Sequence, residues 1–200
     1  MKEAIIHLRR ADAVLNGIIQ QVGDYRIEFR DPDFETLVKS IVYQQLSGRV
    51  ANVIFGRLVE AAGGRLTPAN ILKLRPARMR KAGLSGQKTA YIRDLARHTR
   101  DGNVVFEKLA ELSDQEVTER LTQVKGIGVW TVHMFLIFAL RRPNVLPTGD
   151  LGIRNAIRKA YAMADLPKPA EIETLAAPWH PYCTVASWYL WRSMEPNANL

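Results

Sequence analysis

The chain has 200 residues, 47% hydrophobic and 24% charged, values near globular averages that exclude a disordered tail or a fibrous repeat. The 28 Lys and Arg residues outnumber the 20 Asp and Glu residues, and the resulting net charge of +8 is typical of a protein that meets a polyanion. The single cysteine, Cys183, excludes an intramolecular disulfide, a four-cysteine zinc site and a four-cysteine iron–sulfur cluster within one chain, and favours a reducing compartment.

The periodicity of apolar residues predicts helices from the start of the chain. Apolar residues from Ile5 to Ile19 recur mostly every three or four positions, which predicts one helix ending at Gly23. Residues 24–32 are expected to be extended. Asp33 is a suitable N-cap for a helix over Phe34–Leu46.

Proline, glycine and capping residues divide the rest of the chain into further helices. They are expected at about 49–62, 67–73, 76–81, 87–99, 113–123, 128–140, 150–163, 170–177 and 181–194. The apolar run from Val129 to Leu140 is far shorter than the roughly 20 residues of a membrane span, so it predicts a buried core helix. The N-terminus lacks the uncharged core of a signal peptide. No strand pair and no repeat is evident, so the fold class is predicted to be all-α.

The segment L-T-Q-V-K-G-I-G-V-W-T, residues 121–131, joins two predicted helices. Gly126 and Gly128 allow a sharp turn and close approach of a ligand, and their amides would lie near a helix N-terminus, which favours a phosphate. Lys125 adds positive charge. Many helix–helix corners contain Gly-x-Gly for steric reasons alone, so both interpretations stay open at this point.

An acidic residue, Asp150, follows a proline and a glycine in the segment L-P-T-G-D-L-G, residues 146–152. It is a suitable N-cap, and this structural role is the simpler interpretation. A functional role uses the same physics, because the positive end of the helix dipole favours the ionised carboxylate.

Taken together, these segments resemble the helix-hairpin-helix DNA glycosylase superfamily (HhH-GPD), above all its alkylation-repair branch, the 3-methyladenine DNA glycosylase II type with its short yeast-type relatives. Other segments match in the same order. They are the Q-Q-hydrophobic-Ser segment at 40–47, the G-x-K-x-x-Y-[IL] segment at 86–96, and the C-terminal segments at 178–182 and 186–192.

The resemblance implies a fold of two helical lobes over residues 1–200, with a helix-hairpin-helix motif and the active site in the cleft between the lobes. One lobe is expected at about 33–110, and the other at about 1–32 plus 111–200.

The resemblance also implies a monofunctional DNA glycosylase of base excision repair, which flips out alkylated purines of the 3-methyladenine and 7-methylguanine type and hydrolyses their N-glycosyl bond. Asp150 matches the family aspartate, which stabilises the oxocarbenium-like sugar and helps water to attack. Members that also cut the strand carry a lysine two residues after the second hairpin glycine. Trp130 stands at that position. An indole cannot form a Schiff base, so the enzyme is expected to leave an abasic site and to have no lyase activity.

The resemblance assigns a base pocket to Trp130 and Trp191, because an electron-rich indole attracts a cationic alkylated purine. His133 falls on the same helix face as Trp130, which makes it a candidate for the pocket, while a core histidine with satisfied hydrogen bonds is an equally good interpretation. Met134 stands where some relatives have a pocket tyrosine. Core packing is the alternative for every tryptophan, and it is the favoured interpretation for Trp179 and Trp188.

DNA contacts are expected at three places. Leu46 and Gln45 match the segment that the family inserts into the base stack, although Leu46 could equally be the last buried residue of its helix. Lys125, Gly126 and Gly128 are expected at the DNA backbone. Basic residues that would suit phosphate contacts are Arg75, Arg78, Arg80, Lys81, Lys88, Arg154, Arg158 and Lys159.

No cofactor is expected to be required. With DNA bound, the resemblance implies a monovalent cation, sodium or potassium, on the hairpin carbonyls of Thr122, Val124 and Ile127. The expected partner is double-stranded DNA with alkylated bases, with no membrane contact and a monomeric state, in the cytoplasm (nucleoid) of a bacterium or the nucleus of a eukaryote. Two alternatives stay open: a non-catalytic protein that binds damaged DNA, and a glycosylase for other lesions.

Overall fold

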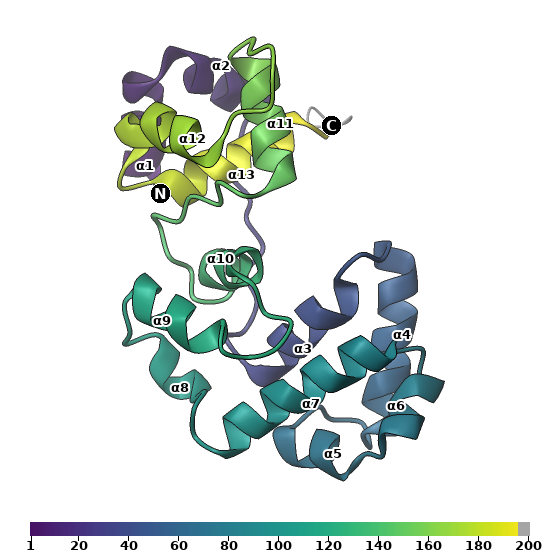
Figure 1. Cartoon of the computed structure of the whole chain (residues 1–200). Coiled ribbons are helices and arrows are strands. Elements are labelled where there is room, and N and C mark those ends of the chain that lie inside the picture. The colour runs from purple at the N-terminus through teal and green to yellow at the C-terminus, as the bar shows by residue number, and fades with distance from the viewer. Residues whose placement is uncertain (196–200) are drawn as a thin grey trace. The chain divides into compact units, whose positions relative to one another are not determined.

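The computed structural model describes residues 1–195, and over that range the fold is all-α, as predicted (Figure 1). The chain forms two compact units. We call Arg30–Phe135 the central unit, and Met1–Phe29 with Leu136–Leu200 the terminal unit. The prediction placed residues 111–135 in the lobe that holds the chain ends. They belong instead to the central unit, where Gln44 and Asp94 hydrogen-bond to residues 125 and 126.

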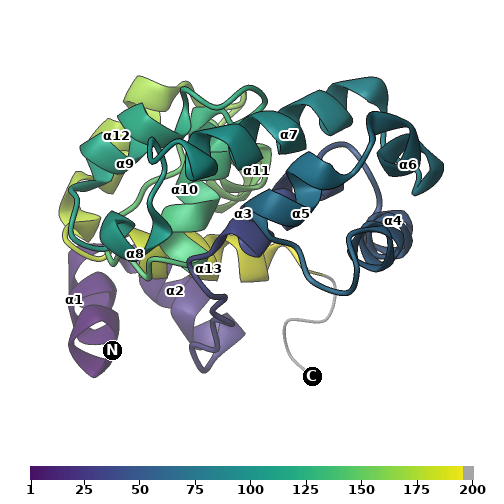
Figure 2. The same ribbon diagram turned by 90° about the horizontal axis from the view of Figure 1, so that it is seen from below.

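The central unit is built around α7 (Gly86–Arg100), which is packed against α3 (Phe34–Tyr43), α5 (Pro68–Lys73) and α6 (Pro76–Lys81) (Figure 2). Its other elements are α4 (Gly48–Ala61), α8 (Phe106–Leu109), α9 (Asp114–Leu121) and most of α10 (Val129–Phe138). The helix α8 was not predicted, because a single turn is too short to show a period.

The predicted helix over Phe34–Leu46 is wrong at its end, since α3 stops at Tyr43. Gln44 leaves the helical region and Gln45 has φ +56°, a left-handed conformation that is uncommon for a residue other than glycine. We call residues 44–47 the wedge turn. Leu46 is therefore not the last buried residue of a helix, and it is 39% exposed.

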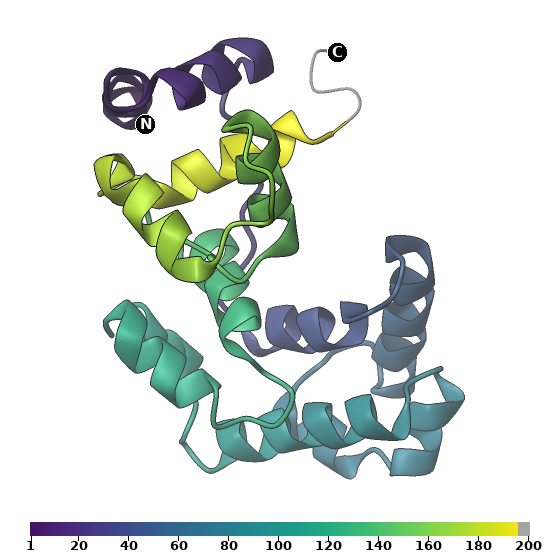
Figure 3. The ribbon, with the colours of Figure 1, turned by 45° about the horizontal axis from the view of Figure 1, so that its top comes forward.

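In the terminal unit, α13 (Cys183–Ser193) is packed against α2 (Ala13–Val22) and α11 (Leu151–Ala160) (Figure 3). The other elements of this unit are α1 (Lys2–Ala11), α12 (Pro169–Ala176) and the short 3-10 helix η1 (Ala177–Trp179). None of the helices in the described chain combines the length and apolar character needed to cross a membrane.

The single helix predicted over the first 22 residues is wrong, because the chain breaks at Asp12 between α1 and α2. The Asp12 carboxylate caps α2 by accepting the N–H of Leu15, and it also accepts hydrogen bonds from Tyr161 Oη (2.5 Å) and Trp179 Nε1 (2.9 Å). Burial raises the pKa of Asp12, but the hydrogen bonds outweigh burial and the pKa lies below its ordinary value.

The core of the terminal unit contains the aromatic residues that were predicted to be structural. Trp179 and Trp188 are buried, which confirms that prediction. Cys183 is buried beside them in the same apolar cluster, and burial raises the pKa of its thiol to about 11.

Candidate functional site

The hairpin between α9 and α10 has a steric reason for its first glycine. Gly126 has φ +84°, and a Cβ placed there would lie 2.1 Å from Cδ2 of Tyr91. Side chains other than hydrogen are therefore excluded by backbone conformation and by contact with the ring. The structural interpretation of this glycine is confirmed.

Gly128 differs from Gly126, because nothing in residues 1–195 requires a glycine there. Its φ is not in the left-handed region, and a Cβ would meet no atom within 4 Å. Gly128 is exposed and directly precedes α10. This position suits the close approach of a ligand from outside to a helix N-terminus. The phosphate-binding interpretation therefore stays a prediction for Gly128, Gly126 and Lys125.

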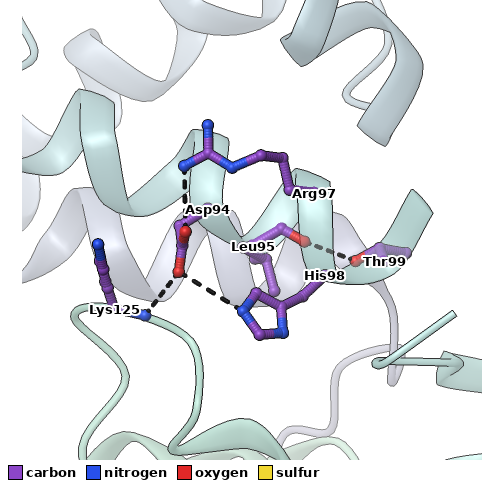
Figure 4. Close-up of polar contacts among 6 residues, drawn as sticks. All are labelled: Asp94, Leu95, Arg97, His98, Thr99 and Lys125. Atoms are coloured by element: carbon purple, nitrogen blue, oxygen red, sulfur yellow. Dashed lines mark hydrogen bonds and ion pairs between the residues drawn. The ribbon is translucent and has the colours of Figure 1, made fainter. Parts of the chain in front are cut away.

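The hairpin is held from the side of α7 by a buried carboxylate, Asp94. Asp94 accepts the backbone N–H of Lys125 through Oδ2 (3.0 Å) and a guanidinium N–H of Arg97 through Oδ1 (3.0 Å), and His98 Nε2 lies 3.7 Å from Oδ2 (Figure 4). Burial raises the pKa of Asp94. The hydrogen bonds from Lys125 and Arg97, with the charges of His98 and Arg97, outweigh burial and hold the pKa below its ordinary value.

We expect Asp94→Asn to lower the free energy of unfolding by about 1–2 kcal/mol at neutral pH, because the amide can still accept the Lys125 N–H but loses the charge. The pKa of Asp94 is lowered in the folded state. Its contribution to the free energy of unfolding is therefore fully present above the ordinary pKa of 3.8, and it is lost as the pH falls through the lowered value. Denaturant unfolding measured across this range should show the difference between wild type and variant shrinking in acid. The control is Asp165→Asn, at an exposed position. An equal loss of unfolding free energy in this variant would contradict the stabilising role of Asp94.

The wedge turn is connected to both α7 and the hairpin. Lys88 Nζ donates to the carbonyls of Val42 (2.7 Å) and Gln44 (2.6 Å), and Gln44 Nε2 donates to the carbonyl of Gly126 (2.8 Å). Burial lowers the pKa of Lys88. Lys88 was grouped with candidate phosphate contacts, whereas here its ammonium is engaged with main-chain carbonyls.

A cavity of about 480 Å³ lies beside the wedge turn within the central unit. Its lining residues come from the wedge turn, α4, the α6–α7 segment and the hairpin: Gln44, Gln45, Leu46, Ile54, Gly83, Leu84, Ser85, Gln87, Lys88, Tyr91 and Gly126. Gln45 and Leu46 thus lie at a hollow of mixed polarity, which is compatible with their predicted contact with DNA.

In the terminal unit, the structure brings Asp150 and Trp191 together. Asp150 is the N-cap of α11, and its Oδ1 accepts the N–H of Ile153 (2.8 Å) and the indole N–H of Trp191 (2.9 Å). The Trp191 ring is stacked on Phe138, with centroids 5.9 Å apart and an interplanar angle of 25°. Gly152 leaves room for this pair, because a Cβ there would lie 3.0 Å from Asp150 Oδ1 and 3.1 Å from Trp191 Cδ1. The N-cap interpretation of Asp150 is confirmed, and the carboxylate is held by two donors on one oxygen.

The other predicted pocket residues lie on α10, in the central unit. Trp130 is 49% exposed at the first turn of this helix, which is unusual for a tryptophan with only a packing role. His133 and Met134 are half-buried one turn later. Burial lowers the pKa of His133, opposed by the charge of Asp114, so its imidazole is neutral at neutral pH. A pocket role for these three side chains stays a prediction.

The hairpin carbonyls are hard oxygen donors, a type that suits sodium or potassium. Val124 O accepts the N–H of Ile127 (3.1 Å), and a carbonyl has a second lone pair that can still coordinate a cation. The donors therefore fit, and the cation site at Thr122, Val124 and Ile127 stays a prediction. Among residues 1–195, no group of three or more His, Cys, Asp or Glu side chains could hold a metal ion.

Four residues of this site were missed or misassigned from sequence: Gln44, Lys88, Asp94 and Phe138. Gln44, Lys88 and Asp94 act through main-chain groups 31 to 82 positions away, and no local pattern signals such contacts. All three lie in segments that match the family, Gln44 in 40–47 and Lys88 and Asp94 in 86–96, and this match was the available signal.

Comparisons with known proteins show which proteins the chain is similar to. The family model of "HhH-GPD superfamily base excision DNA repair protein" matches residues 38–181. The chain is 36% identical to "DNA-3-methyladenine glycosylase 1" of Schizosaccharomyces pombe, over 98% of this chain and 88% of that protein. The solved structure of the 3-methyladenine DNA glycosylase of that yeast with abasic DNA superimposes with a TM-score of 0.84, 36% identity and 95% coverage of both chains. A DNA-3-methyladenine glycosidase of Bacillus halodurans gives a TM-score of 0.87 at 34% identity, over 94% of this chain and 88% of that one.

Proposed function

The chain belongs to the HhH-GPD superfamily of base excision DNA repair proteins, and on this premise we propose that it is a DNA-3-methyladenine glycosylase that hydrolyses the N-glycosyl bond of alkylated purines in duplex DNA. The observation that carries the proposal is the carboxylate of Asp150, held on one oxygen by the Ile153 N–H and the Trp191 indole. A preorganised negative charge of this kind stabilises positive charge that develops in a transition state.

The reaction breaks the bond between the sugar C1′ and the purine nitrogen. The bonding electrons leave with the base, so that a cationic alkylated purine departs as a neutral molecule, and the positive charge that develops on the sugar is stabilised by Asp150. Water then attacks C1′ as the carboxylate accepts one of its protons, and the product is an abasic site. An alkylated purine is already a good leaving group, so one positioned carboxylate suffices.

Recognition of the base relies on aromatic and uncharged groups. Half-exposed Trp130 offers a face on which a cationic purine can stack, an interaction worth about 0.5–2 kcal/mol. The neutral imidazole of His133 does not repel that cation. Trp130 stands where bifunctional relatives have a lysine, so we expect no Schiff base and no strand cleavage.

Binding of the duplex combines charge and shape. The net charge of +8 attracts DNA phosphates. The amide of Gly128 at the start of α10 and the nearby Lys125 suit one phosphate, and Leu46 suits insertion into the stack where the damaged nucleotide is flipped out. We infer that the protein acts as a monomer.

The test is base release from duplex DNA treated with a methylating agent. We expect free 3-methyladenine and 7-methylguanine, alkali-labile abasic sites, and no covalent adduct after borohydride treatment. DNA binding without base release would support the non-catalytic alternative, and release only from oxidised or mismatched duplexes would support another lesion class. Either result would overturn the proposal.

A further inference from the structure

We propose that Lys88 is a positioning residue, which presets the wedge turn for insertion into DNA and is not itself a phosphate contact. The inference rests on the proposed function, and it concerns the step in which the damaged base leaves the stack.

The geometry of the Lys88 ammonium supports this role. A lysine ammonium has three N–H donors, and Nζ of Lys88 directs two of them at the carbonyls of Val42 (2.7 Å) and Gln44 (2.6 Å). The Val42 carbonyl belongs to the last turn of α3, where unsatisfied carbonyls and the helix dipole favour a cation. The Gln44 carbonyl comes just after the helix, in the wedge turn. The ammonium therefore joins the end of α3 to the first residue of the wedge turn.

The segment that follows Gln44 is strained. Gln45 has φ +56°, a conformation that persists in a residue other than glycine only where the surroundings impose it. Gln45 and Leu46 are exposed at the edge of the cavity, so the turn depends on hydrogen bonds more than on buried apolar contacts. Lys88 holds the residue directly before the strained one.

Lys88 lies on the side of α7 that also supports the hairpin. Three side chains of α7 are spaced three residues apart and so lie along one side of the helix: Lys88, Tyr91 and Asp94. Tyr91 fits against Gly126, and Asp94 accepts the N–H of Lys125. One side of α7 thus supports both the wedge turn and the hairpin, and Gln44 links the two by donating to the Gly126 carbonyl.

The experiment compares single-turnover excision of 7-methylguanine from a perfect duplex and from the same strand in a short mismatched bubble, where the base needs no wedge to leave the stack. In Lys88→Met, we expect excision from the duplex to fall about ten- to a hundredfold, as for loss of one or two hydrogen bonds to a charged group. Excision from the bubble should stay close to wild type. Lys108→Met, at an exposed lysine of α8, should leave both rates unchanged.

Two further measurements distinguish positioning from other roles. Neutralising a phosphate contact lowers the slope of log affinity against log salt by about 0.9, whereas the slope of Lys88→Met should equal that of wild type. In the background of Leu46→Ala, Lys88→Met should cause no further loss, because both changes disable the same wedge.

Equal losses on duplex and bubble, a reduced salt slope, or additive effects of the two substitutions would each overturn the role of Lys88. Thermal unfolding of Lys88→Met identifies a misfolded variant. If that variant does not fold, Lys88→Gln, whose shorter side chain is polar but uncharged, takes its place in the duplex and bubble comparison. We expect the same selectivity, a loss on the duplex and none on the bubble. A wild-type protein that releases base from neither substrate would instead overturn the proposed function, and this inference with it.

Discussion

Replacing Asp150 with Asn is expected to reduce base release by at least about a hundredfold, the loss seen when one preorganised electrostatic group is removed. Asn is as good an N-cap as Asp, and its amide oxygen can still accept from Ile153 and Trp191, which hold Asp150 at 2.8 and 2.9 Å. The substitution therefore removes charge with little change in structure. Single-turnover release of 7-methylguanine, measured beside affinity for methylated duplex DNA, should show lost activity and retained binding.

A matched control is available in the same type of cap. Asp33 caps α3 by accepting the N–H of Thr36 at 2.8 Å, and Asp33→Asn should leave the excision rate unchanged. Wild-type activity in Asp150→Asn would show that the carboxylate serves only to cap α11. Lost activity in both variants would point to a general effect on folding.

The two hairpin glycines are expected to respond in opposite ways to alanine. Gly126→Ala should lower the free energy of unfolding by about 3 kcal/mol or more, because it adds left-handed strain to a clash with the Tyr91 ring. Gly128→Ala should leave the stability nearly unchanged, because the added methyl group meets no atom of the protein. It should weaken DNA binding roughly tenfold, because the methyl group keeps the phosphate away from the backbone N–H, and this is the size of a lost hydrogen bond to a charged group. Thermal unfolding and DNA titration of both variants check this contrast.

Each variant serves as the control for the other. A stable Gly126→Ala protein would mean that the hairpin relaxes away from Tyr91 at low cost. If Gly128→Ala bound DNA as tightly as wild type, Gly128 would not contact the DNA backbone. The hairpin glycines would then have a structural role only.

The fold class could be predicted because most helices are amphipathic and have clear caps. The Ser113 capping box, for example, is present with both of its hydrogen bonds. The break at Asp12 was missed because the apolar period continues across it, while the reason for the break lies in Tyr161 and Trp179, far along the chain. A helical period reports local preference, and a partner from another element can override it.

Within the candidate site, residue types were easier to predict than contacts. Asp150 was visible because an acid after Pro and Gly is a recognisable cap, and Trp191 because its segment matched the family. The hydrogen bond that joins them could not be predicted, since 41 positions separate them. For Lys88, the residue type alone suggested a different contact. Its positive charge suggested binding to a phosphate, whereas in the structure the ammonium donates hydrogen bonds to the carbonyls of Val42 and Gln44.

The buried thiol of Cys183 makes the protein convenient for site-specific labelling. It is the single cysteine of the chain, it is fully buried, and a pKa of about 11 leaves almost no reactive thiolate at neutral pH. A cysteine introduced at an exposed position such as Lys108 would therefore react with a maleimide dye while Cys183 stays unmodified. A chain with this one substitution can thus carry one fluorophore, which allows its binding to DNA to be followed without removing any cysteine.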